Sequence, residues 1–207
     1  ENNFPYLIEN NDKIISLQKN LAVNTNLILG LTRKENKNYY NSLYAINNSI
    51  IKKFDKNILV PFGEFIPFRN LFKFMEYIAG SNDFSVGTKN RIIELDDHIR
   101  ILPVICYEIL FFWILMNDEN FNSNIIINIT NDSWFGNFSG PYQHFYFTRL
   151  RAAEFNKPLI RVSNNGISAV IDNYGNIIEY IGLNKQQTKI SKLRILDKQY
   201  NYLKFHK

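Results

Sequence analysis

The chain has 207 residues, of which 45% are hydrophobic and 21% charged, so it is long enough for one sizeable globular core. Its net charge of +5 is spread along the sequence without any motif for reading nucleic acid, which argues against a nucleic-acid-binding protein. A single cysteine excludes an internal disulfide, and three widely spaced histidines give no metal-ligand pattern.

The first third of the chain predicts a helix followed by antiparallel strands. Residues 7–22 place apolar side chains loosely at helical spacing, and a polar break follows them. A charged turn or hairpin loop is expected over 32–38, between the first and second strands. The predicted strands are 27–31, 39–46 and 49–54.

An unusual loop follows these strands. Residues 56–67 contain two prolines and a glycine, so they should be irregular, yet they are strongly apolar. Loops normally lie at the surface in contact with water, so the one lysine and one glutamate here, Lys56 and Glu64, stand out. A short amphipathic segment, 70–79, comes next and ends at Gly80.

The second half alternates strands and helices. A strand pair joined by an Asp96-Asp97 turn is expected first, and the tail from about residue 184 is polar and should be peripheral. No repeat or linker divides the chain, so we expect one domain, 1–207, of α/β class with mixed strand pairing. The predicted strands are 92–95, 98–106, 124–130, 159–163, 167–171 and 177–181, and the predicted helices are 108–116 and 141–156.

The only cysteine, Cys106, ends a buried apolar strand, and chemistry in open α/β sheets collects at the carboxyl ends of strands. Cys106 is then either a small buried hydrophobic residue or a nucleophile. A nucleophilic thiol needs a base and a group that holds the oxyanion. His144 is one candidate base; the alternative is a carboxylate together with an ammonium group. Lys56, beside a dry apolar loop, favours the second arrangement.

Six short segments resemble, in order, those of a known family. Residues 54–67, which carry Lys56 and the run LVPFGE, resemble the lysine segment of the nitrilase superfamily, and of apolipoprotein N-acyltransferases in particular. Residues 105–108, with Cys106, resemble the nucleophile segment of that family. The remaining four segments are 131–136, 141–144, 149–152 and 163–168.

The resemblance implies a nitrilase-like four-layer α-β-β-α sandwich. Family members carry membrane spans before and after this domain, and a first strand and helix precede the catalytic glutamate. The chain begins with Glu1 and shows none of these, so we expect it to be a piece of a longer protein. In that protein the catalytic domain would face the periplasm at the bacterial inner membrane.

The resemblance also implies a Glu-Lys-Cys triad. Glu1, which keeps the family spacing to Pro5, would be the base; otherwise it is an exposed terminal residue. Cys106 would be the nucleophile. Lys56, with backbone amides near Tyr107, would stabilise the oxyanion; otherwise it is a solvated lysine at a strand end.

Further residues would support the triad. Glu64 and Glu108 would orient Lys56 and the substrate amine, or else form simple salt bridges in the site. Tyr107 would form a wall of the site, and His144 would be structural. The family pattern implies no cofactor and no metal.

The implied activity is N-acyl transfer. A fatty acyl chain would pass from a phospholipid to a thioester on Cys106, and then to the N-terminal amine of a diacylglyceryl-cysteine lipoprotein. The implied partners are the phospholipid donor, the apolipoprotein acceptor and a membrane surface, which an apolar arm over 65–78 would contact. Two alternatives stay open: a soluble carbon–nitrogen hydrolase (an amidase) and an inactive truncated copy that only binds lipid.

Overall fold

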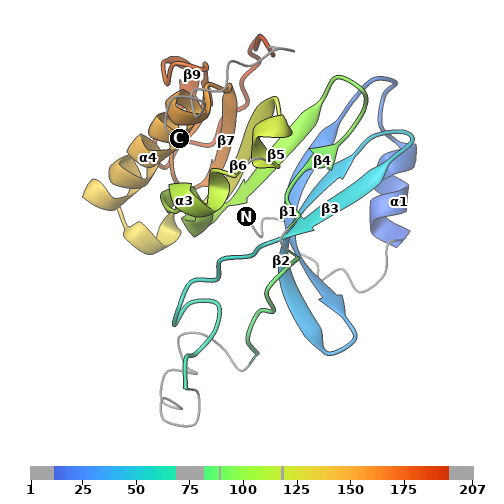
Figure 1. Ribbon diagram of the computed structural model, residues 1–207, viewed down its shortest axis with the longest axis horizontal. Coiled ribbons are helices and arrows are strands. Elements are labelled where there is room, and N and C mark those ends of the chain that lie inside the picture. The colour runs from blue at the N-terminus through green and yellow to red at the C-terminus, as the bar shows by residue number, and fades with distance from the viewer. Residues whose placement is uncertain (1–11, 69–81, 89, 118, 196–207) are drawn as a thin grey trace. The chain divides into compact units, whose positions relative to one another are not determined.

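The computed structural model of the protein describes residues 12–68, 82–88, 90–117 and 119–195 (Figure 1). The chain divides into two compact units, Glu1–Asn90 and Arg91–Lys207. Each unit has its own sheet and its own helix layer, and the predicted single domain over 1–207 stays a prediction.

The first unit is a three-stranded antiparallel sheet with one helix against it, shown in blue and cyan in Figure 1. Ile14 on the helix is fully buried and packs with Leu31, Tyr44 and Ile46 of the sheet. The apolar positions of both elements therefore meet in one small core. The elements are α1 (Asp12–Lys19), β1 (Leu27–Glu35), β2 (Asn38–Ile46) and β3 (Ile51–Asp55).

The first strand is longer than its composition suggests. Residues 32–38 were expected to form a charged loop, but β1 continues to Glu35 and only a tight turn separates it from β2. Arg33 explains the difference, because its guanidinium is buried in an ion pair with Asp55 at the end of β3, 2.6 Å away. The charged residue Arg33 can therefore lie within a strand, because the sheet places the carboxylate of Asp55 beside it. The predicted segment 70–79 lies outside the described residues.

The second unit contains a mixed six-stranded sheet in the order β4-β5-β6-β7-β8-β9. Its three central strands, β5, β6 and β7, are parallel, and the outer pairs are antiparallel. The strands are β4 (Ile93–Glu94), β5 (Arg100–Ile105), β6 (Ile125–Asn131), β7 (Leu159–Asn164), β8 (Ser168–Ile171) and β9 (Ile177–Ile181). The helices are η2 (Cys106–Leu110), α3 (Phe112–Leu115), η3 (Asn120–Asn122), η4 (Ser133–Phe135) and α4 (Ser139–Phe155).

Helix α4 covers one face of this sheet. Its Phe145, Ala152 and Phe155 form the core with apolar side chains of β5 to β8 (Figure 1). Because β5, β6 and β7 run in parallel, their carboxyl ends share one edge, where Cys106 and Asp132 follow directly. This edge is where the fold gathers polar side chains.

The predicted helix over 108–116 is broken into two short pieces. The 3₁₀ helix η2 ends at Leu110. The next residue, Phe111, has a φ of −98° and a ψ of 70°, which are not helical, and α3 begins after it. The carboxylate of Glu108 accepts a hydrogen bond from the backbone N–H of Ile105 at 2.9 Å, which favours a tight 3₁₀ turn over a continuous α-helix. Within the part of the chain that the structure describes, no helix has the length and apolar character needed to cross a bilayer.

Candidate active site

The backbone of Lys56 is fixed on both sides, directly after β3. Its N–H donates to the carbonyl of Asn41 and its carbonyl accepts from the N–H of Gly87, both at 2.9 Å. A Cβ on Gly87 would lie 2.1 Å from the carbonyl oxygen of Asp55, so only glycine permits this close approach. The sequence carried no sign of this role for Gly87.

The ammonium of Lys56 is 1% exposed and is paired with Glu64. Its Nζ lies 2.9 Å from Oε1 and 2.8 Å from Oε2 of that carboxylate. Oε1 also accepts from Nδ2 of Asn41, and Oε2 from the backbone N–H of Val60, each at 2.8 Å. The contacts with Glu64 compensate the buried charge of Lys56 and fix the position of its ammonium group.

The apolar loop that follows Lys56 folds back on itself and so places Glu64 beside the Lys56 ammonium. The Glu64 N–H donates to the carbonyl of Val60, and the Phe62 N–H donates to that of Phe65, both at 2.8 Å. Phe62 adopts a φ of 62°, in the left-handed region, which such a sharp reversal requires. Leu59 and other apolar side chains of the loop are buried, which explains why a loop in this position is not polar.

The end of β3 is anchored by Asp55. Its two carboxylate oxygens accept from Arg33 at 2.8 and 2.6 Å, and one of them accepts from the hydroxyl of Ser42 at 2.6 Å. Burial alone would raise the pKa of Asp55, but the hydrogen bonds from Arg33 and Ser42 outweigh it, so the pKa is lowered. The ionised carboxylate of Asp55, bound by Arg33 and Ser42, therefore fixes the end of β3 directly before Lys56.

Cys106 has a strained backbone. It follows the last residue of β5, is 7% exposed and has a φ of 49°. The left-handed region costs a non-glycine residue free energy, and such residues concentrate at functional sites. A structural role as a small apolar residue would not require this conformation.

Glu108 holds the turn that carries Cys106. It is fully buried; besides its bond from the Ile105 N–H, it pairs with Arg91, whose Nη1 and Nη2 lie 3.0 and 2.8 Å from the two oxygens. Tyr107 is half-buried, with its ring edge-on to Phe111 at 4.8 Å. Arg91 was not predicted, because nothing in its sequence neighbourhood links it to a residue in the turn.

The structure brings together some of the predicted residues. Lys56 and Glu64 are in contact within the first unit, and Cys106, Tyr107 and Glu108 share one turn in the second. Glu1 lies outside the described residues, so its part in the site stays a prediction.

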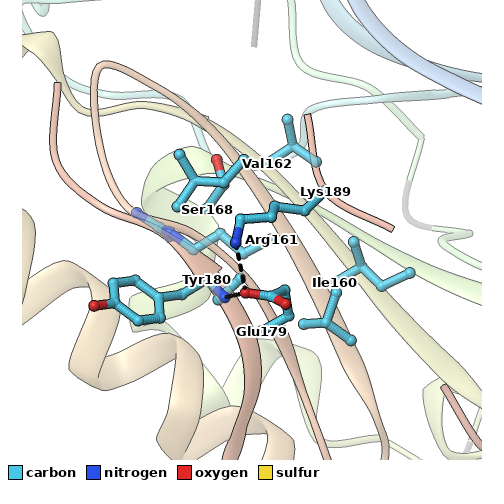
Figure 2. A pocket seen from close by; sticks show the side chains of 10 residues that line it. Ile160, Arg161, Val162, Ser168, Glu179, Tyr180 and Lys189 are labelled. Atoms are coloured by element: carbon cyan, nitrogen blue, oxygen red, sulfur yellow. Dashed lines mark hydrogen bonds and ion pairs between the residues drawn. The ribbon is translucent and has the colours of Figure 1, made fainter. Parts of the chain in front are cut away.

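A shallow pocket of about 150 Å³ lies on the second sheet, over strands β7, β8 and β9 (Figure 2). It is formed by side chains of β7, β8 and β9 and by Lys189, whose Nζ lies 3.1 Å from Oε1 of Glu179. Of the predicted site residues that the structure describes, none lines this pocket.

Comparisons with known proteins agree with the sequence segments. The family model of carbon-nitrogen hydrolases matches residues 19–195. Proteins named apolipoprotein N-acyltransferase are similar to the chain: that of Rhizobium rhizogenes is 38% identical over 198 residues, and that of Rickettsia prowazekii is 42% identical over 149 residues. These alignments cover 90% and 70% of this chain, but 37% and 30% of the relatives. The chain therefore spans about a third of the length of these curated relatives.

Solved structures share the fold. A CN-hydrolase superfamily protein from Xanthomonas campestris has a TM-score of 0.62 at 16% identity, covering 86% of this chain and 68% of that one. A carbon-nitrogen hydrolase from Helicobacter pylori has a TM-score of 0.60 at 14% identity, covering 78% and 60%. The predicted nitrilase-like α/β fold class is confirmed. The family model matches most of the chain, and the chain belongs to the carbon-nitrogen hydrolase family.

Proposed function

We propose that the chain is the catalytic domain of an apolipoprotein N-acyltransferase that works through a thioester on Cys106. The similarity to proteins of that name supports the reaction class. The observation that carries the chemistry is the strained conformation of Cys106 at the carboxyl edge of the sheet. A thiol held there by a fixed backbone suits nucleophilic attack.

In the first half-reaction, the carboxylate of Glu1 takes the proton of the Cys106 thiol. The thiolate attacks the carbonyl carbon of a phospholipid acyl ester, so that a C–S bond forms and the ester C–O bond breaks. The lysophospholipid leaves as an alcohol and carries the proton away. The ammonium of Lys56 and backbone amides near Tyr107 stabilise the oxyanion of the tetrahedral intermediate.

In the second half-reaction, the N-terminal amine of a diacylglyceryl-cysteine lipoprotein attacks the thioester. An amide C–N bond forms, the C–S bond breaks, and the amine proton passes through Glu1 to the Cys106 sulfur. The enzyme returns to its starting state. No cofactor enters either step.

Two buried carboxylates serve the reacting groups. Glu64 holds the Lys56 ammonium through contacts of 2.8–2.9 Å, which orients it before substrate arrives. Glu108 binds the Ile105 amide and so fixes the turn on which Cys106 sits. In the proposal Glu108 also orients the substrate amine, and Tyr107 forms a wall of the site.

A lipid substrate requires contact with a membrane surface, and the described chain exposes aromatic side chains suited to one. Aromatic residues favour the interface between lipid and water. We assign this contact to the segment 65–78 and to the second unit. Residues 65–68 of that segment are described, and Phe68 among them is 81% exposed. The exposed aromatic residues of the second unit include Phe112, Trp113, Trp134, Phe135, Phe138, Tyr142 and Tyr146. The full protein would act at the bacterial inner membrane, with this domain in the periplasm.

The test is the intact mass of the protein after incubation with phospholipid vesicles. An acyl-sized increment that hydroxylamine removes is expected, and Lys56→Ala should abolish it. Lys53→Ala is the matched control, because Lys53 is an exposed lysine on β3, the strand that leads to Lys56, and it should leave the increment in place. Absence of any increment, with release of ammonia from small amides, would identify the soluble hydrolase instead. An unreactive protein that binds vesicles equally well with Cys106→Ala would identify an inactive lipid-binding copy.

A further inference from the structure

Exposed aromatic side chains recur along the first half of α4. Tyr142 and Tyr146 lie in the helix, and Phe138 is its N-cap residue. These three follow one another at intervals of four residues, which places them along one side of a helix. Trp134, four residues earlier, lies in η4. We call these four residues the aromatic face; each is between 54% and 86% exposed.

The sequence around the aromatic face carries no charged side chain. Residues 133–148 contain no aspartate, glutamate, lysine or arginine, although 21% of the whole chain is charged. The one histidine in this stretch, His144, is buried. A helix that covers a sheet normally presents charged and polar residues on its outward side, because that side is in contact with water. An uncharged aromatic outward side instead marks a surface that binds an apolar partner.

The loop that carries Trp134 is fixed at both ends. At its start, Oδ2 of Asp132 accepts a hydrogen bond from Nη2 of Arg161 at 2.6 Å, and both side chains are buried. Near its end, Oδ1 of Asn137 accepts from Nδ2 of Asn184 at 2.7 Å. The exposure of Trp134 is therefore built into an ordered loop. Such a loop loses little conformational entropy when it binds a partner.

The aromatic face lies next to the turn that carries Cys106. The ring of Phe135, the residue after Trp134, lies 5.3 Å from the ring of His144. Nε2 of His144 in turn lies 3.3 Å from the backbone carbonyl oxygen of Cys106. Both the loop and the turn follow the carboxyl ends of neighbouring parallel strands, β6 and β5. A partner bound by the aromatic face would therefore be held close to the Cys106 turn.

The composition of the aromatic face indicates the kind of partner. Tryptophan and tyrosine combine an apolar ring with one polar group, and they favour the zone of a bilayer between acyl chains and headgroups. Attraction to anionic headgroups needs lysine or arginine, which the stretch 133–148 lacks. Protein interfaces are also rich in aromatic residues, but they are enriched in arginine as well. The uncharged part of a lipid bilayer therefore fits this surface best.

We propose that the aromatic face inserts into the uncharged boundary of a phospholipid bilayer, at the acyl chains, and holds the Cys106 turn against the lipid whatever the charge of the headgroups. This inference deepens the proposed function and rests on it for the presence of a lipid substrate. Within the membrane contact of the second unit, it singles out one surface beside Cys106 and an attraction that requires no anionic lipid.

The first test uses the fluorescence of Trp134. The chain has two tryptophans, so Trp113→Phe leaves Trp134 as the only one. Phosphatidylcholine vesicles with brominated acyl chains should quench its fluorescence and shift its emission to shorter wavelength, equally in about 0.1 M and about 1 M NaCl. Absence of quenching overturns the proposal, and so does quenching that requires anionic phosphatidylglycerol and disappears at high salt. An emission shift without lipid that grows with protein concentration would assign the face to a second copy of the chain, and would also overturn it.

The second test compares two substitutions in binding to phosphatidylcholine vesicles. Phe138→Ser should weaken binding about tenfold, because burial of one phenylalanine ring in lipid contributes at least that factor. Phe138 makes no side-chain capping hydrogen bond and serine is a favoured N-cap residue, so this variant should keep α4. Tyr174→Ser is the matched control: Tyr174 is an exposed aromatic residue in the turn between β8 and β9, and this turn lies at the other edge of the sheet because β8 runs antiparallel to β7. It should leave binding unchanged.

Unweakened binding by Phe138→Ser, or an equal loss in Tyr174→Ser, overturns the proposal. Neither test measures acyl transfer. If Cys106→Ala retained acyl transfer while Trp134 was quenched by brominated lipid, the proposed function would fail and the role of the aromatic face would stand. If Trp134 stayed unquenched while Cys106 captured an acyl chain from phospholipid dispersed in detergent, only the role of the aromatic face would fail.

Discussion

Glu64→Gln tests whether the Lys56 ammonium depends on its buried partner. Both oxygens of Glu64 accept hydrogen bonds, from Lys56, Asn41 and the Val60 N–H, at 2.8–2.9 Å. Glutamine replaces one oxygen with an amide that only donates, so one donor loses its acceptor and the lysine loses its counter-charge. Breaking a buried pair on one side costs about 3–5 kcal/mol. Because the glutamine oxygen still accepts from Lys56, we expect about 3 kcal/mol.

The assay is urea unfolding followed by circular dichroism. A loss of about 3 kcal/mol lowers the unfolding midpoint by about 1 M, with the slope unchanged. Glu35→Gln is the matched control, because Glu35 pairs with Arg33 at 2.8 Å but is exposed, and it should leave the midpoint nearly unchanged. Equal midpoints for the two variants would show that the Lys56–Glu64 pair does not hold the loop, and would refute the reasoning.

Three further predictions follow from the strained turn, the tight glycine and the buried carboxylate. Cys106→Gly should be more stable than Cys106→Ala by about 1 kcal/mol in urea unfolding, because glycine tolerates the φ of 49° without strain. A less stable Cys106→Gly would show that the backbone at this position is not strained. Gly87→Ala should lower the free energy of unfolding by about 1–3 kcal/mol and reduce acyl capture, because its Cβ would meet the carbonyl oxygen of Asp55 at 2.1 Å. Gly182→Ala is the control, because its Cβ would meet nothing closer than 3.9 Å, and it should change neither quantity. Asp132 has a pKa of about 2 in the folded state, below the 3.8 of a free carboxyl, so its ionised form adds about 2 kcal/mol to the free energy of unfolding above pH 4, and this is lost between pH 4 and pH 2. Asp132→Asn should therefore make the free energy of unfolding depend less on pH in that window. An unaltered pH dependence below pH 4 would contradict the assignment.

Strands with an unbroken apolar run could be read from the sequence. The strand expected over 98–106 is present as β5, Arg100–Ile105, because β-branched residues bounded by turns favour a buried strand. The Asp96-Asp97 turn is also present, with the Asp96 carboxylate accepting from the His98 and Ile99 amides at 2.8 and 2.7 Å. These features are local, so a short window of sequence contains their cause.

The features that were missed depend on contacts across the fold. Arg33 looked like a loop residue because its partner, Asp55, lies 22 positions away in sequence. The helix expected over 108–116 failed for a similar reason, since Glu108 bonds back to Ile105 and to Arg91. His144 was correctly placed on a helix, but its contacts with Asp132 and Cys106 could not be inferred from spacing.

In the candidate site, too, the features carried by a short stretch of sequence could be predicted, and those that depend on distant contacts could not. The residue types at Lys56, Glu64 and Cys106 could be predicted, because they lie in short segments that resemble those of a known family. The residues that hold them, Asn41 and Gly87, carry no such signal. A glycine required by one close carbonyl looks like any other glycine in a loop.

The central claim is that the Cys106 sulfur carries the acyl chain between donor and acceptor. A single-turnover chase measures this directly: protein acylated with phospholipid is freed of lipid and mixed with a diacylglyceryl-cysteine peptide. The account predicts that the hydroxylamine-sensitive mass increment leaves Cys106 and appears on the peptide as an amide at the same rate. An increment that persists on the protein while the peptide is acylated, or peptide acylation by Cys106→Ala, would contradict it.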